Sequence, residues 1–155
     1  TNITLDTLHY AFGKLPVYWI ATHQKPYASV YNHPYDGGPL VKVLLIKNKP
    51  IQLEILTKDL NPGEYYWQIT DEDGSGCERN FIKLWDRVVY QQALNRLLKS
   101  VPVTSYAETA YLKGFLMEEN HFLAEALKYY HLAVKFNPSN KIFKKSLAKF
   151  YENNF

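Results

Sequence analysis

Apolar and polar residues alternate over short stretches in the first half of the chain. Gln52 and Glu54 lie between apolar residues in the run IQLEIL. Tyr65, Trp67 and Ile69 take every second place in the run YYWQIT, so each stretch offers one apolar face, as β-strands do. Residues typical of turns separate the stretches, and we predict strands at Ile3 to Tyr10, Val17 to Thr22, Tyr27 to Tyr31, Leu40 to Lys47, Ile51 to Leu56, Glu64 to Thr70 and Arg79 to Trp85. About seven short strands with no helical pattern between them predict an antiparallel β-sandwich over residues 1–85.

The pattern changes to a helical period after residue 85. In the run DRVVYQQALNRLLKSVP, Asp86 is a suitable N-cap and Pro102 ends the segment. The predicted apolar stripe consists of Val89, Ala93 and Leu97, with Leu94 and Leu98 beside it. No Gly/Ser-rich or proline-rich linker separates this segment from its neighbours, so we predict a connecting helix that couples two modules rigidly.

The segment from residue 107 to residue 138, AETAYLKGFLMEENHFLAEALKYYHLAVKFNP, predicts two antiparallel helices. Gly114 and Ala126 allow two helix backbones to approach closely, and Tyr130 fills the space beside them. Pro138 ends the second helix because proline has no N–H to donate to the preceding turn.

The same residues carry a family resemblance. Gly114, Ala126, Tyr130, Ala133 and Pro138 have the spacing of a tetratricopeptide repeat, so residues 103–155 resemble that family. The chain departs from the family pattern at three places: Ala110 stands where a large aromatic is usual, Lys113 where a leucine is usual, and Met117 where a tyrosine is usual. The resemblance implies an α-helical hairpin followed by the first helix of a second repeat, with Leu147, Ala148 and Tyr151 in register.

The last sixteen residues predict a capping helix with two different sides. Its apolar side consists of Phe143, Leu147, Phe150 and Tyr151, and its basic side of Lys141, Lys144, Lys145 and Lys149. The lysines form either a solvated outer face or a surface for an anionic partner.

A second resemblance lies in the β half. The run LNPGEYYWQI, residues 60–69, resembles the corner that opens a late strand in fibronectin type III and other immunoglobulin-like sandwiches. Tyr66 has the fibronectin spacing from Gly63, whereas Tyr65 shares the inward side with Trp67, so either hydroxyl is a candidate for tying down the corner. The run PVYWIAT, residues 16–22, resembles an early strand that carries the core tryptophan.

Composition narrows the functional classes. Hydrophobic residues make up 46% of the 155 residues and charged residues 21%, which is typical of a folded chain. The formal net charge of +3 is small and gives little support for nucleic-acid binding. Cys77 is the only cysteine, which excludes an internal disulfide and a cysteine-based zinc site. No run approaches the roughly 20 apolar residues of a transmembrane helix.

Candidate chemistry is sparse. Asp71, Glu72 and Asp73 before Gly74 lack the alternate-residue spacing of a calcium loop, and we interpret them as a hairpin turn.

His23 and His33, with Asp36, are a weak candidate for a metal site, and we interpret them as separate surface residues. His121 and His131 are interpreted as a turn residue and an exposed helix residue. We predict no catalytic residues, no metal and no cofactor, because no nucleophile, base and orienting group occur together.

Binding is the remaining function. The chain has 13 tyrosines, 8 phenylalanines and 3 tryptophans, and aromatic residues dominate binding hot spots. Tyr111 and Phe115 on the first repeat helix, with Lys144 and Lys145 on the capping helix, form one candidate partner site for a helix or extended, acidic segment or for a neighbouring copy. Tyr31 and Tyr35, beside a loop rich in proline and glycine, form the other.

The sequence therefore predicts an α+β protein: an immunoglobulin-like sandwich at residues 1–85, and a connecting helix with tetratricopeptide-like helices at 86–155. The expected function is a non-catalytic interaction or scaffold module in a bacterial cell-envelope assembly, because similar pairings occur in exported bacterial proteins. A sensory ectodomain of a membrane protein and a carbohydrate-binding module are the alternatives. The chain begins with Thr1 and not with methionine, so we expect processing or a missing upstream segment. Location in the periplasm or at the cell surface follows from the resemblance alone.

Overall fold

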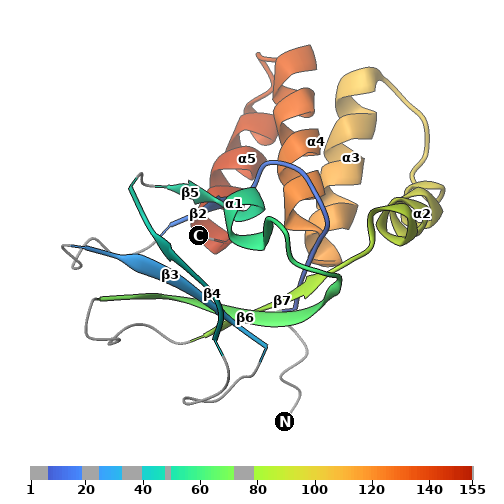
Figure 1. The fold of residues 1–155 in the computed structure, drawn as a ribbon. Coiled ribbons are helices and arrows are strands. Elements are labelled where there is room, and N and C mark those ends of the chain that lie inside the picture. Colours follow the sequence, from blue (N-terminus) through green and yellow to red (C-terminus); the bar gives the residue numbers. More distant parts are fainter. Residues whose placement is uncertain (1–6, 19–24, 33–39, 48–49, 72–78, 155) are drawn as a thin grey trace, which may run out of the picture. The chain divides into compact units, whose positions relative to one another are not determined.

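A computed structural model describes residues 7–18, 25–32, 40–47, 50–71 and 79–154. The chain divides into two compact units (Figure 1). The first consists of Thr1–His9 and Leu15–Trp85, and the second of Tyr10–Lys14 and Asp86–Phe155. The change of unit after Trp85 falls where the sequence pattern changes from strands to helices.

The first unit is built on a five-stranded sheet with the strand order β1-β7-β6-β3-β4. Its strands are β1 (Leu8–Tyr10), β3 (Tyr27–Tyr31), β4 (Leu40–Leu45), β6 (Gly63–Thr70) and β7 (Asn80–Leu84). β3 pairs antiparallel with both β4 and β6, and β6 pairs antiparallel with β7. A separate two-stranded sheet joins β2 (Pro16–Val17) to β5 (Ile51–Gln52).

One face of the larger sheet carries the apolar core of this unit. Ala28 pairs with Ile69 across β3 and β6, and Tyr65 pairs with Ile82 across β6 and β7. Ala28, Ile69 and Ile82 are all buried. Ile69 thus lies on the predicted inward side of β6, but Gln68 and Thr70 on the other side are buried as well, so burial does not alternate along this strand.

The predicted strand from Ile51 to Leu56 is wrong. Only Ile51 and Gln52 are extended, and the chain then forms the short helix α1 (Leu53–Thr57). Leu53 and Leu56 are fully buried, whereas Ile55 is 50% exposed. Burial thus follows the helical spacing of three residues and not the strand spacing of two.

The α+β class is confirmed, but the described strands do not form a closed antiparallel sandwich. They form one mixed five-stranded sheet and one two-stranded sheet. Of the predicted core strand Val17 to Thr22, only Val17 lies in a described strand, and residues 19–22 are outside the described residues.

The second unit is helical. Its helices are α2 (Arg87–Leu98), α3 (Tyr106–Glu119), α4 (Leu123–Phe136) and α5 (Lys141–Asn154). The Asp86 carboxylate accepts from the backbone N–H groups of Val88 and Val89, which confirms it as the N-cap of α2. Ser105 and Asn140 cap α3 and α5 in the same way. The predicted helical hairpin and last helix are therefore present.

Helix α2 buries most of the stripe that we predicted, since Leu94 is buried and Ala93, Leu97 and Leu98 are half-buried, but it covers Tyr90 in place of Val89. Tyr90 and Leu94 are buried, whereas Val89 is 48% exposed. The ring of Tyr90 packs edge-on against Phe12 and tilts against Phe122. Because Phe12 belongs to the helical unit, an aromatic residue from far upstream determines which side of α2 is covered.

Candidate partner-binding surface

Helices α3 and α4 pack closely because Gly114 has no side chain. A Cβ atom built at Gly114 would lie 2.8 Å from Cδ1 of Tyr130, closer than carbon atoms approach without displacement. Ala126 and Ala133 on α4 are completely buried. The predicted roles of the small residues and of Tyr130 in this hairpin are confirmed.

Glu118 ties the three helices together at one end. Its carboxylate accepts a hydrogen bond of 2.8 Å from the Tyr130 hydroxyl of α4 and one of 2.9 Å from the Asn154 amide of α5. Burial raises the pKa of the Tyr130 hydroxyl, and the hydrogen bond to Glu118 raises it further. Tyr130 therefore stays protonated and donates to Glu118 throughout the physiological pH range.

Tyr111 belongs to the interior of the helical unit. Its ring stacks on Phe143 of α5 with centroids 4.9 Å apart, and it packs against a buried cluster with Ala107 and Ala110. The side chain is only half-buried, but its ring serves the contact between α3 and α5. Tyr111 is thus a structural residue at the edge of the candidate surface.

Phe115 lies beside Tyr111 and remains open. It is four residues after Tyr111 and three before Glu118, so it lies on the side of α3 that faces α5. Gly114, which faces Tyr130 of α4, is one residue earlier, and one residue is about 100° of helical rotation. Phe115 therefore points away from α4, and its side chain is 48% exposed.

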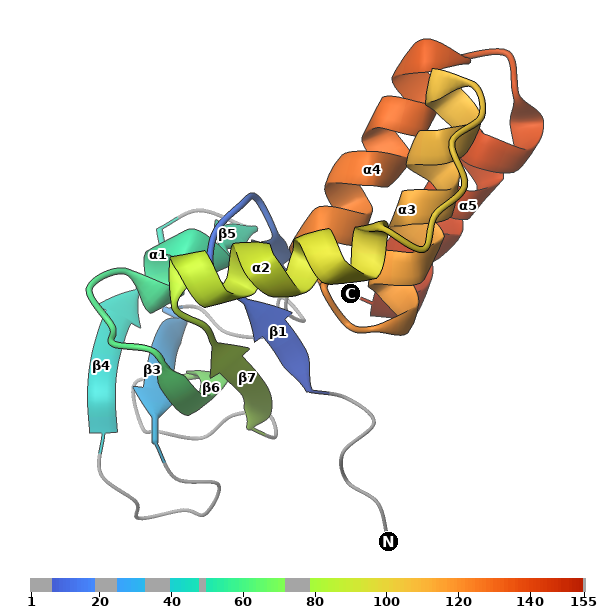
Figure 2. The ribbon, with the colours of Figure 1, turned by 90° about the vertical axis from the view of Figure 1, so that its right-hand side faces the viewer.

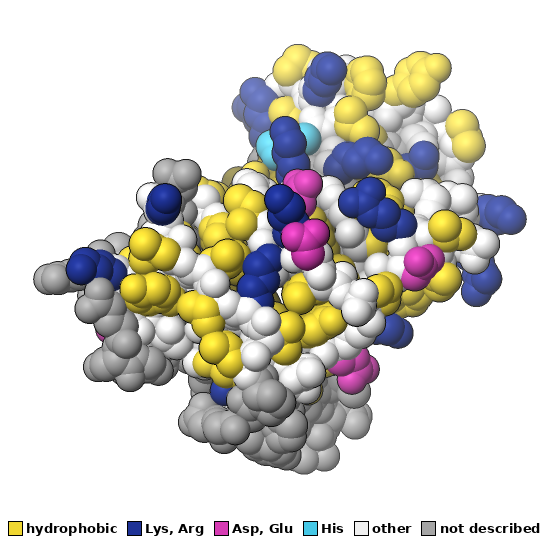
Figure 3. All heavy atoms as spheres, in the orientation of Figure 1, with side chains coloured by type: hydrophobic (Ala, Val, Ile, Leu, Met, Phe, Trp, Pro, Cys, Tyr) yellow, Lys and Arg dark blue, Asp and Glu magenta, His cyan; other side chains and the backbone are white. Residues whose placement is uncertain are grey.

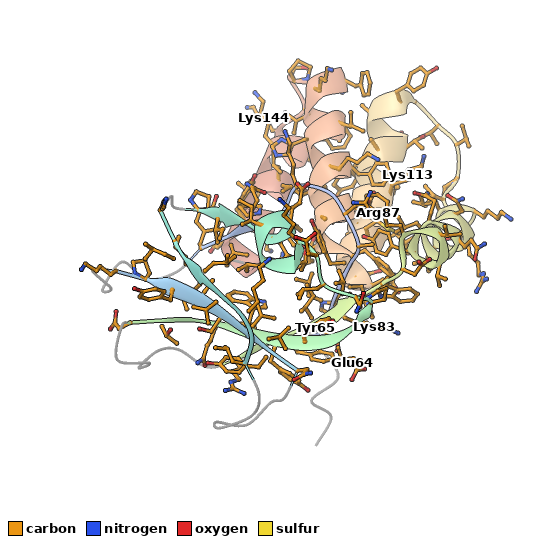
Figure 4. All side chains as sticks on the ribbon, in the orientation of Figure 1. Glu64, Tyr65, Lys83, Arg87, Lys113 and Lys144 are labelled. Atoms are coloured by element: carbon orange, nitrogen blue, oxygen red, sulfur yellow. The ribbon has the colours of Figure 1, made fainter. Side chains whose placement is uncertain are left out.

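Phe143 and Phe150 are the buried residues of α5, and they lie in a line along the helix. The helix surface on each side of this buried line is called a flank. Lys144 and Tyr151 each follow one of these residues, and the Tyr151 hydroxyl lies 3.3 Å from the His131 ring of α4. Lys144 therefore lies on the flank beside α4 (Figure 4). The structure does not bring Lys144 and Phe115 onto one surface.

The opposite flank of α5 carries Ile142 and Lys149, which each precede one of the buried phenylalanines. Since Tyr111 contacts Phe143 and Glu118 contacts Asn154, α3 and α5 run in the same direction, side by side as in Figure 2. That order places Lys149 at the level of Phe115. Ile142 is 65% exposed, and Lys149 is also exposed.

We call Phe115, Ile142 and Lys149 the α3/α5 face. Lys145 borders it, on the side of α5 opposite the buried line. The sequence prediction missed Ile142. Its position one residue before Phe143, on the predicted apolar side, could have indicated that it lies at the edge of that side.

The second predicted site lies partly outside the described residues, because Tyr35 is not among them. Tyr31 is half-buried. The guanidinium of Arg79 lies 3.5 Å from the centroid of its ring, and its hydroxyl accepts a hydrogen bond of 3.3 Å from Gln68. The Tyr31 ring is therefore already in contact on one side.

The histidine interpretations are tested in part. His121 lies in the turn between α3 and α4 with a φ of 61°, and His131 is exposed on α4, so both interpretations are confirmed. His23, His33 and Asp36 lie outside the described residues, as do Glu72, Asp73 and Gly74. Within the described residues, no group of three His, Cys, Asp or Glu side chains has the arrangement of a metal site.

One buried carboxyl group lies on α4. Glu125 is 5% exposed and its nearest described cation is Lys128, at 3.8 Å. Burial raises the pKa of Glu125, and Lys128 lowers it by a smaller amount. None of the described helices has the length and apolar character needed to cross a bilayer.

No protein-family model matches the chain, and no curated protein matches it.

Proposed function

We propose that this chain is a non-catalytic protein-interaction module whose helical unit binds an extended or helical segment of a partner at the α3/α5 face. The observation that carries the proposal is the exposure of Phe115 and Ile142 beside Lys149, on two helices that contact each other through buried and half-buried side chains. Aromatic and aliphatic anchors on a rigid support are typical of binding surfaces.

The support behind the face is well defined. The stack of Tyr111 on Phe143 and the Asn154–Glu118 hydrogen bond connect α3 to α5. A partner that binds there encounters side chains whose backbone is already ordered, so little entropy is lost on this side of the interface. Lys145 and Lys149 favour a partner with acidic residues.

The close packing of Gly114 against Tyr130 supports the tetratricopeptide-like proposal. In such repeats the first helices of successive units line the binding surface, and α3 and α5 would hold these positions. The short array gives a short surface, which suits a single docked segment.

The immunoglobulin-like proposal for the β unit draws support from its corner. The Tyr65 hydroxyl donates a hydrogen bond of 2.7 Å to the carbonyl oxygen of Asn61, four residues upstream, and Figure 4 labels Tyr65 on β6. A tyrosine that bonds back to the preceding corner is a feature of these sandwiches. Tyr65, and not Tyr66, supplies this contact.

We further propose that the module works in a bacterial cell-envelope assembly, in the periplasm or at the cell surface. The sequence resemblances support this location. A sensory ectodomain with the same partner face is the alternative; a membrane helix and a signalling domain in the full gene would support it.

The test compares two lysines on the same helix. Proteins cross-linked to the wild-type chain in its native source are identified by mass spectrometry, and the experiment is repeated with the single variants Phe115→Ala, Lys149→Glu and Lys144→Glu. We expect Lys149→Glu to reduce partner capture more than Lys144→Glu, because Lys144 lies on the flank beside α4. Higher salt should weaken the wild-type contact.

Equal capture by the Lys149→Glu and Lys144→Glu variants, once circular dichroism shows that both are folded, would place the binding site elsewhere in the chain. Broad hydrolase and transferase screens should stay at background. Reproducible turnover that is lost on substitution of His23, His33 or Asp71 would contradict the non-catalytic proposal.

A further inference from the structure

Strand β4 ends the larger sheet on one side, and no described strand pairs with its outer edge. Its sequence is LVKVLL, and four of its six side chains are large, apolar and well exposed. The exposed fractions are 52% for Leu40, 39% for Val41, 46% for Val43 and 50% for Leu45. Figure 3 shows a row of apolar side chains over the place that β4 occupies in Figure 1.

The backbone direction of β4 follows from one hydrogen bond. The N–H of Ile46 donates to the carbonyl oxygen of Pro26 at a distance of 2.9 Å, and the next pair in register is Tyr27 with Leu45. In an antiparallel ladder, hydrogen-bonded and non-hydrogen-bonded pairs alternate. Leu44 therefore directs its N–H and C=O toward β3, whereas Val43 and Leu45 direct theirs to the outer edge.

The edge lacks the usual charged protection. Natural edge strands often carry a lysine that prevents pairing with another chain. The only charged residue of β4 is Lys42, and its ammonium donates to the carbonyl oxygens of Ile55 and Lys58 at 3.0 and 2.9 Å. These contacts hold the charge over α1, away from the outer edge.

From this arrangement we propose that β4 pairs antiparallel with β4 of a second copy of this chain, about a two-fold axis at Val43. In that register the outward backbone groups of Val43 bond to those of the partner's Val43. Leu45 lies opposite the partner's Val41, where the pairing of β4 with β3 shifts in register between Val30 and Tyr31, so the regular part of the new ladder is centred on Lys42 to Leu44. Lys42 lies opposite the partner's Leu44.

The register centred on Val43 is more favourable than the neighbouring one. A register one residue further toward the N-terminus of β4, centred on Lys42, places two lysines directly opposite each other, which is unfavourable. The Val43 register avoids this contact and brings exposed apolar side chains together on both copies. It also closes after two chains, because a two-fold pairing uses the same edge of β4 on both copies.

Sedimentation equilibrium of the full chain tests the proposal. We expect a concentration-dependent mass of two chains for the wild type and for Val43→Ile. Val43→Pro should be monomeric, because proline removes an N–H that points outward while the bonds of Leu44 to β3 remain. Val43→Lys should also be monomeric, since it places like charges on the axis. Val103→Lys, which changes a 90% exposed apolar residue between α2 and α3, should leave the dimer intact.

Cross-linking tests the register. In a Cys77→Ser background, Val43→Cys should form a disulfide with itself, since the Cα atoms of a hydrogen-bonded pair are about 5.5 Å apart, within disulfide range. Leu45→Cys should not, because four residues along the strand separate it from its counterpart by about 14 Å. A wild-type monomer at all concentrations, a dimer that survives both Val43→Pro and Val43→Lys, or efficient Leu45→Cys self-cross-linking would overturn the proposal.

Discussion

Replacing Gly114 with alanine adds one methyl group where the helical hairpin leaves no room for it. The new Cβ would lie 2.8, 3.0 and 3.2 Å from three ring atoms of Tyr130. Unstrained carbon contacts are about 3.5–4.0 Å, so the ring or the helix must move by more than half an ångström. Tyr130 is 2% exposed, and its hydroxyl is bonded to Glu118, so the ring has little freedom to move.

Two opposing effects determine the result. Alanine favours a helix over glycine by about 0.8–1.0 kcal/mol. Overpacking a filled interior costs about 1–3 kcal/mol. We therefore expect Gly114→Ala to lower the free energy of unfolding by about 1 kcal/mol, and Gly114→Leu to lower it further, because three more carbon atoms must be accommodated.

Urea unfolding followed by helical circular dichroism measures the change, with the slope of the transition checked for constancy. Lys144→Leu, at an exposed position of α5, is the control and should change little. In a Tyr130→Leu background the aromatic ring is absent, and Gly114→Ala should then become stabilising. If Gly114→Ala alone, with Tyr130 present, stabilises the protein by the full difference in helix propensity, the close approach of α3 and α4 is refuted.

Three further changes test individual contacts. Tyr65→Phe should lower the free energy of unfolding by about 0.5–1.5 kcal/mol through loss of the corner hydrogen bond, and Tyr66→Phe should have a smaller effect; the reverse order in urea unfolding would contradict the corner. Asp86→Ala should cost about 0.5–2 kcal/mol as the N-cap of α2 is lost, whereas Asp86→Ser should retain most of the stability; equal losses would contradict capping. Burial raises the pKa of Glu125, so the folded state binds its proton more tightly than the unfolded state. The resulting contribution to folding stability is fully present below the unfolded pKa and is lost as the pH rises through the folded pKa. Glu125→Gln should therefore gain thermal stability relative to wild type at neutral pH more than in acid, and a pH-independent difference would contradict this reasoning.

The sequence alone determined the elements whose signals are local. Pro138 predicted the end of α4 because a missing N–H acts within one turn of the helix. Gly114 and Tyr130 predicted the hairpin through their spacing, since a small residue on one helix leaves room for a ring on the next. Asp86 predicted the start of α2 because a capping carboxylate bonds to N–H groups two and three residues ahead. The strand β6 was equally readable from its alternating residue types, although its burial does not alternate.

Tertiary packing decided the features for which two local readings compete. The run from Ile51 to Leu56 fits both a strand and a helix, and the burial of Leu53 and Leu56 selects the helix after Gln52. Helix α2 has apolar residues on two sides, and the contact of Phe12 with Tyr90 selects the side that is covered.

The candidate surface depended on packing in the same way. Tyr111 and Phe115 share a side of α3 and are equivalent in the sequence pattern. Only the stack of Tyr111 on Phe143 assigns one to the interior and leaves the other exposed. Lys144 and Lys149 are likewise equivalent until the contact of Tyr151 with His131 identifies the flank beside α4. Local sequence fixes which side chains share a side of a helix, but their exposure depends on residues that are distant in the chain.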